Sequence, residues 1–309
     1  MLKQVMEIYE LLDKATANGR EVEEYLRSRG AEDVVIQTVS GEKGSTDFIK
    51  VSIKGREGKL SGGDAPTLGV TGRLGGLGAR PEILGFVSDG DGALTALSVA
   101  LKLVDMQKNG DVLKGDVIIT THICPDAPTR EHFPVRFMGS PVDIDTMNKL
   151  EVTDDMNAIL SIDTTKGNKV INTRGFAISN TVKEGYILKV SNDLAEIMMR
   201  ATGKLPYVFP LSQQDITPYG NGLYHLNSIL QPAVATEAPV VGVAITTEVP
   251  VPGCATGSTH LTDIEMTGRF VIEVAKDFGE KRCKFYDEEE YELILKLYGD
   301  MKKFQTRGV

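Results

Sequence analysis

The 309-residue chain contains no tryptophan, and aromatic residues make up only 6% of it. It carries 34 lysines and arginines against 43 aspartates and glutamates, a formal net charge of −9, without a basic cluster. An acidic surface repels phosphate backbones, and single-stranded nucleic acid is usually held on aromatic stacking platforms. The composition therefore argues against nucleic acid as a partner and, less strongly, against an anionic membrane surface.

Long hydrophobic runs are also missing. Short apolar runs such as 117–121 carry threonine, and none approaches the roughly 20 residues that span a bilayer. Residues 1–15 mix apolar and charged positions, as in an amphipathic helix and unlike a signal peptide. The three cysteines, Cys124, Cys254 and Cys283, lie far apart and indicate no disulfide framework. We therefore expect no membrane partner and a reducing, cytoplasmic location.

Apolar periodicity and turn residues predict alternating strands and helices. Strands are expected at 33–39, 46–54, 67–71, 83–87, 116–121, 158–163, 168–178, 185–190, 207–209 and 240–246. Helices are expected twice within 1–30, once between Gly92 and Asn109, and at 194–201, 263–278 and 288–304, while a connection precedes 158–163. This alternation predicts an α/β fold, a doubly wound mixed sheet with helices on both faces.

We expect one domain over 1–309, because no linker or repeat divides the chain. Residues 1–54 would form N-terminal helices and a hairpin, 66–278 the core sheet and site, and 285–309 a C-terminal helix. In open α/β sheets, ligands collect beyond the carboxyl ends of the strands. Polar residues that follow predicted strands are Arg73, Asp89, Asp91, His122, Cys124, Asp126, Asp163, Cys254 and His260. Converging carboxylates and imidazoles are what a divalent metal needs.

Each candidate also has a simpler structural interpretation. Asp91 at a helix start is more readily a helix cap than a metal ligand, and Asp89 is evenly balanced between the two. Asp126, between two prolines, is typical of an ordinary turn. His122 fits a buried, hydrogen-bonded histidine, and Cys124 a small buried hydrophobic residue. The residue types alone leave these alternatives open.

The order and spacing of these residues resemble the zinc-dependent aminopeptidase and carboxypeptidase superfamily over about residues 66–278. Three segments carry the resemblance: GFVSDGDGA at 85–93, KGDVII at 114–119 and AILSID at 158–163. They are similar to that superfamily's bridging-aspartate segment, the strand before its Glu-Glu pair, and its third-ligand strand. The resemblance implies a three-layer α/β/α fold with metal at the sheet edge. The chain also resembles an uncharacterised bacterial and archaeal family of unknown function.

The resemblance implies four metal ligands in this chain. Asp89 would bridge two metals, Asp126 would bind the second metal, Asp163 the first, and His260 would be the late ligand. Arg73 stands where the superfamily has the histidine of His-x-Asp, and a guanidinium cannot ligate and repels a cation. The resemblance therefore implies one divalent metal, with zinc favoured, or none.

The general base of the superfamily is also missing, because Pro125 and Asp126 replace its Glu-Glu pair. His122 and Asp91 are the remaining candidates for taking a proton. Arg73 is the candidate for holding a substrate carboxylate, and Asp215 lies where the superfamily has an aspartate-bearing turn, so both are predicted to bind substrate.

Two functions remain open, and with them whether the chain is an enzyme. The first is a metal-dependent hydrolase acting on a peptide or an N-acylated amino acid. The second is a non-catalytic relative that binds a small acidic metabolite or peptide. A thiol enzyme using Cys124 with His260 is a third, weaker hypothesis. The oligomeric state is also open, with a homo-oligomer among the expectations.

Overall fold

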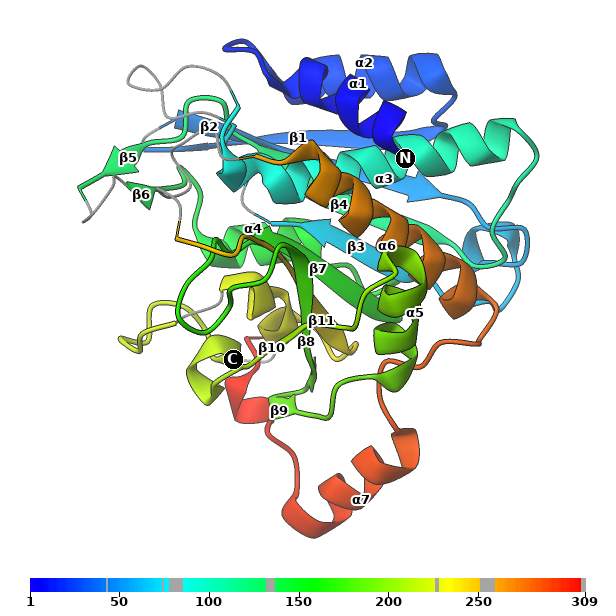
Figure 1. The fold of residues 1–309 in the computed structure, drawn as a ribbon, viewed down its shortest axis with the longest axis vertical. Helices are drawn as coiled ribbons and strands as arrows, with labels where there is room; N and C mark the ends of the chain where they lie inside the picture. The colour runs from blue at the N-terminus through cyan, green and yellow to red at the C-terminus, as the bar shows by residue number, and fades with distance from the viewer. Residues whose placement is uncertain are drawn as a thin grey trace.

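The protein is built around one large mixed sheet covered by helices, as the computed structural model in Figure 1 shows. The structure describes residues 1–42, 44–73, 75–77, 86–131, 137–225, 228–250 and 259–306. Within them the sheet has nine strands in the order β1-β2-β4-β3-β7-β11-β8-β10, with β9 beside β8. The strands are β1 (Asp33–Gly41), β2 (Gly44–Ile53), β3 (Leu68–Gly72), β4 (Val117–Ile123), β7 (Ala158–Thr164), β8 (Gly175–Lys183), β9 (Tyr186–Ile187), β10 (Val208–Phe209) and β11 (Val240–Thr246).

The four central strands β4, β3, β7 and β11 run parallel to one another. Strand β2 is antiparallel to β4, and β8 is antiparallel to β11, so the sheet is mixed. Every residue of β3, β4 and β11 is buried, as expected for strands covered on both faces. The carboxyl ends of the four parallel strands therefore meet at one edge of the sheet.

Helices cover both faces of this sheet. A hydrophobic core joins one face to α1 (Leu2–Leu12), α2 (Gly19–Arg29), α3 (Asp91–Lys108), α5 (Asn192–Thr202) and α6 (Leu261–Gly279). A second core joins the other face to η4 (Ser228–Ala235), which also contacts α4 (Ile144–Glu151). Helix α7 (Glu288–Tyr298) projects from the body (Figure 1). The predicted α/β fold with a mixed sheet and helices on both faces is confirmed.

Short elements complete the chain. They are the 3-10 turns η1 (Lys59–Ser61), η2 (Ser88–Gly90), η3 (Gln213–Ile216) and η5 (Lys302–Phe304), and a two-stranded sheet of β5 (Thr129–Arg130) and β6 (Phe137–Met138). None of the helices in the described ranges combines the length and apolar character that a membrane span requires.

The close approach of α3 to β3 positions the helix start at the sheet edge. A Cβ atom on Gly72 would lie 2.4 Å from the carbonyl oxygen of Gly92 and 2.8 Å from Cβ of Ala96. A Cβ atom on Gly92 would lie 2.4 Å from the carbonyl oxygen of Arg73. Both positions therefore need glycine, and Asp91 is held beside the end of β3.

Three sequence expectations are wrong in detail. The strand expected at 168–178 begins only at Gly175, because the Asn168 side chain accepts hydrogen bonds from the amides of Val170 and Ile171 and closes a turn there. The strand expected at 185–190 is only Tyr186–Ile187. The last helix ends at Tyr298, followed by Gly299 with a positive φ of 77°.

Helix α4 was not expected from the sequence, in which the segment before 158 was predicted to be a connection. Asp143 caps this helix by accepting from the amide of Thr146 at 2.8 Å. The strand expected at 83–87 lies mostly outside the described residues, and its last two residues are not in a strand. The division into 1–54, 66–278 and 285–309 stays a prediction.

Candidate functional site

Arg73 is a buried cation at the carboxyl end of β3. Its side chain is 1% exposed, and Nη1 donates to Oε2 of Glu151 at 2.5 Å and to Oδ1 of Asn148 at 3.4 Å. Its backbone amide donates to the carbonyl of Ile162 in β7 at 2.7 Å. Because an unpaired buried charge is costly, Glu151 at the end of α4 makes the burial of Arg73 tolerable. Arg73 thus lies inside the protein, on the side of α4 and η4.

His122, near the end of β4, shares the same glutamate. Its Nδ1 is hydrogen-bonded to Oε1 of Glu151, and its Nε2 accepts from the backbone amide of Gly75 at 3.3 Å. Since an amide can only donate, the ring proton lies on Nδ1 and the Nε2 lone pair is used. Burial would raise the pKa of Glu151, but the ring of His122 and the guanidinium of Arg73 outweigh it and hold that pKa below its ordinary value. The predicted base His122 therefore has both ring nitrogens engaged by protein groups.

Asp163 ends β7 as a buried carboxyl group. It accepts from the amide of Thr164 at 2.6 Å and from Oγ of Ser228 at 3.2 Å. Burial raises the pKa of Asp163 to about 7, and the negative charge of Asp91 adds to this. The amide of Thr164, the guanidinium of Arg73 and the hydroxyl of Ser228 act in the opposite direction. This group therefore carries a proton over much of the range below neutral pH.

Asp91 is the first residue of α3 and is fully buried. It accepts from Nζ of Lys166 at 3.2 Å and from Oγ1 of Thr259 at 2.7 Å. Burial raises the pKa of Asp91 to about 6, against the charges of Lys166 and His260 and the hydrogen bond from Thr259. The N-cap of the helix is Gly90, so the simple interpretation of Asp91 as a cap is wrong. Its carboxylate instead joins the loop after β7 to the residue before His260.

The four predicted metal ligands lie in different surroundings. Asp89 is buried near Gly76, whose added Cβ would lie 2.6 Å from Oδ2 of Asp89, and Asp163 is buried as described above. Asp126 is exposed, and His260 is 47% exposed with Nδ1 3.4 Å from Oδ2 of Asp263. In the part of the chain that the structure describes, no group of three or more His, Cys, Asp or Glu side chains is arranged to hold a metal ion.

The predicted set Asp89, Asp126, Asp163 and His260 is therefore not brought together as a metal site, and these residues do not fit a metal centre in this arrangement. The physical reason lies in the neighbours of the edge carboxylates. Arg73 places a guanidinium next to Asp163, and such a cation opposes a metal ion nearby.

The remaining predicted residues have structural partners. Asp215 is buried and closes a capping box, because Oδ2 accepts from both the amide and the hydroxyl of Ser212 at 2.8 Å. Cys124 is buried, and burial raises the pKa of its thiol to about 11, so it is not a thiolate near neutral pH. Cys124 thus fits the small buried residue of the simpler interpretation, and Cys254 lies outside the described residues.

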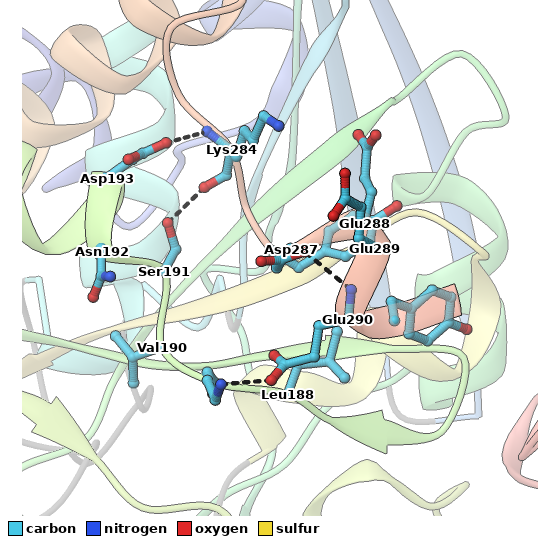
Figure 2. A pocket seen from close by; sticks show the side chains of 13 residues that line it. Leu188, Val190, Ser191, Asn192, Asp193, Lys284, Asp287, Glu288, Glu289 and Glu290 are labelled. Carbon is cyan, nitrogen blue, oxygen red and sulfur yellow. Dashed lines mark hydrogen bonds and ion pairs between the residues drawn. The ribbon is translucent and has the colours of Figure 1, made fainter. Parts of the chain in front are cut away.

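A surface pocket of about 530 Å³ lies elsewhere, between the start of α7 and residues 188–193 (Figure 2). Its polar groups hold the two segments together. Asp193 accepts from the amide of Lys284 at 2.7 Å, and Lys189 pairs with Glu290 at 2.5 Å. None of the residues at the carboxyl edge lines this pocket. The candidate site is therefore the edge cluster of Arg73, Asp91, His122, Glu151, Asp163 and Lys166.

Comparison with known protein families shows which family the chain belongs to. The model of a family described as "Protein of unknown function (DUF1177)" matches residues 37–308. The chain belongs to this family. The prediction that it belongs to an uncharacterised family is thereby confirmed. No curated protein matches the chain significantly.

Solved structures similar to this DUF1177 chain include two aminopeptidases. The LapA aminopeptidase of Legionella pneumophila is 12% identical, with a TM-score of 0.47, over 89% of this chain and 70% of that one. A TET aminopeptidase from a marine sediment Thaumarchaeota archaeon is 11% identical, also at 0.47, over 90% of this chain and 99% of that one. Similarity at this level carries no activity to the DUF1177 chain, since one fold serves many functions.

Several residues of the site in this DUF1177 chain were not found from the sequence. Glu151 was missed because α4 was missed, although Asp143 and the apolar residues Ile144, Met147 and Leu150 mark a capped amphipathic helix. Lys166 lies two residues beyond the end of β7. The same search for polar residues after strand ends that gave Asp163 could therefore have found it.

Tyr219 was also not found from the sequence, because no strand pattern points to it. It hydrogen-bonds to Ser228, and its ring stacks on His225 with centroids 4.5 Å apart. The side chain is 39% exposed. Tyr219 therefore lies between solvent and the Ser228–Asp163 pair.

Proposed function

We propose that this protein binds a small carboxylate-bearing molecule at the carboxyl edge of its sheet, in contact with Arg73. One observation carries the proposal. Arg73 is 1% exposed, yet its Nε and Nη2 have no hydrogen-bond partner among the described residues, while Nη1 is held by Glu151. Leaving a buried donor unsatisfied costs about 1–3 kcal/mol. A ligand that accepts from these two atoms recovers that cost.

The geometry of the two unpartnered nitrogens of Arg73 favours a carboxylate group in the ligand. Nε and Nη2 of a guanidinium point the same way and match the two oxygens of a carboxylate in a bidentate pair. The pairing of Nη1 with Glu151 keeps the plane of the group in place, which lowers the entropic cost of binding. Peptides with a free carboxyl terminus, N-acylated amino acids and small acidic metabolites all offer this group.

A calorimetric titration with matched ligands tests the proposal. N-acetyl-L-alanine is expected to bind, and N-acetyl-L-alanine amide is not, because an amide offers one oxygen in place of two. Arg73→Lys keeps the charge next to Glu151 but loses the bidentate edge, and we expect it to weaken binding of the acid about tenfold or more. Arg56→Lys, at an arginine that is 51% exposed and paired with Glu280, is the control. Equal binding of acid and amide, or an unchanged affinity in Arg73→Lys, contradicts the proposal.

Hydrolysis of the bound molecule is the second candidate function, on a peptide or an N-acylated amino acid. It is supported by the presence at one edge of two buried carboxyl groups, Asp91 and Asp163, which influence each other electrostatically, with Lys166 bound to the first. General acid–base chemistry uses such groups. The described residues do not fit a metal, so no step is assigned to one.

Amine release from N-acetylated amino acids and dipeptides, followed with an amine-reactive fluorophore, tests hydrolysis. Activity that is present without added metal and lost in Asp163→Asn supports it. Activity that requires added Zn²⁺ would instead support the metal-dependent hydrolase that the sequence suggests. Binding without turnover in either condition leaves the ligand-binding proposal standing and removes the hydrolase.

A further inference from the structure

Gln231 presents an unused acceptor inside the protein. It lies in η4 and is 0% exposed. Its Nε2 donates to the carbonyl oxygens of Thr217 at 3.0 Å and Asp215 at 3.4 Å, while its Oε1 has no hydrogen-bond partner among the described residues. Because both carbonyls can only accept, the amide cannot be turned over without losing two bonds. Oε1 of Gln231 therefore stays directed away from the carbonyl oxygens of Asp215 and Thr217.

Asn148 links the backbone of Gln231 to the guanidinium of Arg73. Its Oδ1 accepts from Nη1 of Arg73 at 3.4 Å, and its Nδ2 donates to the backbone carbonyl of Gln231 at 3.2 Å. All three residues are buried, and α4, which carries Asn148, contacts η4, which carries Gln231. Two unsatisfied donors and one unsatisfied acceptor are thus contributed by residues that share one bridging side chain.

We infer that Gln231 makes the carboxylate site selective for acids that carry a hydrogen-bond donor next to the carboxylate, such as the N–H of an N-acylated amino acid or of a peptide's last residue. This inference rests on the proposed function. Arg73 takes the carboxylate, and Oε1 of Gln231 accepts from the N–H. An acid without the donor leaves Oε1 buried and unsatisfied, and that difference is the source of the selectivity.

A matched pair of acids tests this selectivity. N-acetyl-L-alanine and O-acetyl-L-lactate have the same shape and carboxylate, but the second has an ester oxygen in place of the N–H. We expect the wild-type protein to bind the first about tenfold or more tightly, because the second leaves a buried acceptor unpaired. Equal affinities for the two acids overturn the inference while leaving the carboxylate-binding proposal intact. If neither acid binds, both are overturned.

Two variants test whether the Gln231 side chain is the source of the selectivity. Gln231→Met keeps the length of the side chain without the acceptor, and it is expected to bind the two acids within about twofold of each other. Gln214→Met, at an exposed glutamine of η3, should keep the wild-type ratio. Retained selectivity in Gln231→Met overturns the inference. If Gln231→Met does not fold, the ratio for the wild-type protein decides, together with a liganded crystal structure. If that crystal structure shows a water molecule bound to Oε1 of Gln231 in place of the ligand N–H, the inference is also overturned.

Discussion

The residue that most shapes the candidate site is Arg73, because it turns a sheet edge expected to hold metal into one that holds a buried cation. Glu151 balances the charge of Arg73 through one carboxylate oxygen, and its other oxygen is hydrogen-bonded to Nδ1 of His122. Buried ion pairs seldom stabilise a fold relative to apolar residues of similar volume, but removing only one partner strongly lowers the free energy of unfolding. Substrate binding, which the sequence suggested for Arg73, cannot be tested by deleting the side chain.

Arg73→Ala is expected to lower the free energy of unfolding by about 3–5 kcal/mol, since it leaves the buried Glu151 without its guanidinium partner. Arg56→Ala removes an exposed arginine that pairs with Glu280, and it should cost at most about 1 kcal/mol. Urea denaturation followed by circular dichroism measures both. A loss below about 1 kcal/mol in Arg73→Ala would show that the ion pair is not formed in solution.

The raised pKa values of Asp163 and Asp91 lead us to expect an unusual pH dependence of the free energy of unfolding. Their folded-state pKa values, about 7 and about 6, lie above the ordinary value of 3.8. A raised folded pKa contributes stability that is complete below the unfolded pKa and is lost as the pH rises through the folded pKa. The free energy of unfolding should therefore fall between about pH 4 and pH 7, with Asp163 contributing on the order of 4 kcal/mol.

Urea denaturation across this pH range checks the prediction. Asp163→Asn should flatten the decline, because an amide does not titrate, while the exposed control Asp111→Asn should leave the profile unchanged. Stability that increases from pH 4 to pH 7 in the wild-type protein, with no change in Asp163→Asn, would contradict the assignment of this carboxyl group.

At the scale of elements, the contact between β3 and α3 brings the helix start to the sheet edge. Gly72→Ala places a Cβ 2.4 Å from the backbone oxygen of Gly92, which cannot move without shifting α3. We expect a loss of about 1–3 kcal/mol or more in unfolding free energy, together with weaker ligand binding, as the edge residues shift. Gly139→Ala is the control, since its nearest contact would be 3.3 Å. Unchanged stability in Gly72→Ala would show that the two elements are not this close.

Sequence patterns located some elements better than others, and burial explains the difference. The strands at 158–163 and 240–246 were found because a strand buried on both faces is a short, continuous apolar run. Helix α4 has eight residues and only one apolar stripe, so it resembled a connection. The turn at Asn168 depends on a side chain bonding to its own backbone, which interrupts an otherwise strand-like sequence.

At the scale of the whole molecule, metal content separates the two functions that the sequence left open. Because the predicted ligands do not form a metal site and Arg73 opposes a cation at this edge, we expect less than one equivalent of tightly bound divalent metal per chain after dialysis. Plasma emission analysis of the purified protein measures it. One or more equivalents per chain, lost in Asp89→Ala, would show that the predicted ligands do converge. Zero equivalents, with no rise in melting temperature on adding Zn²⁺, would favour the binding protein.

Local patterns in the chain were enough to predict the class of fold and the edge at which polar residues gather. Apolar periodicity is a local property, and the carboxyl ends of parallel strands must meet, so Arg73, Asp91, His122 and Asp163 could be predicted to lie there. The partners of these residues follow only from how distant segments pack in the folded protein. Glu151 and Gln231 lie 78 and 158 positions beyond Arg73 in the chain, and no local pattern relates them to it. Hydrogen-bond partners depend on packing across the sheet, and packing turned a predicted metal site into a buried ion-pair cluster with an unpaired guanidinium edge.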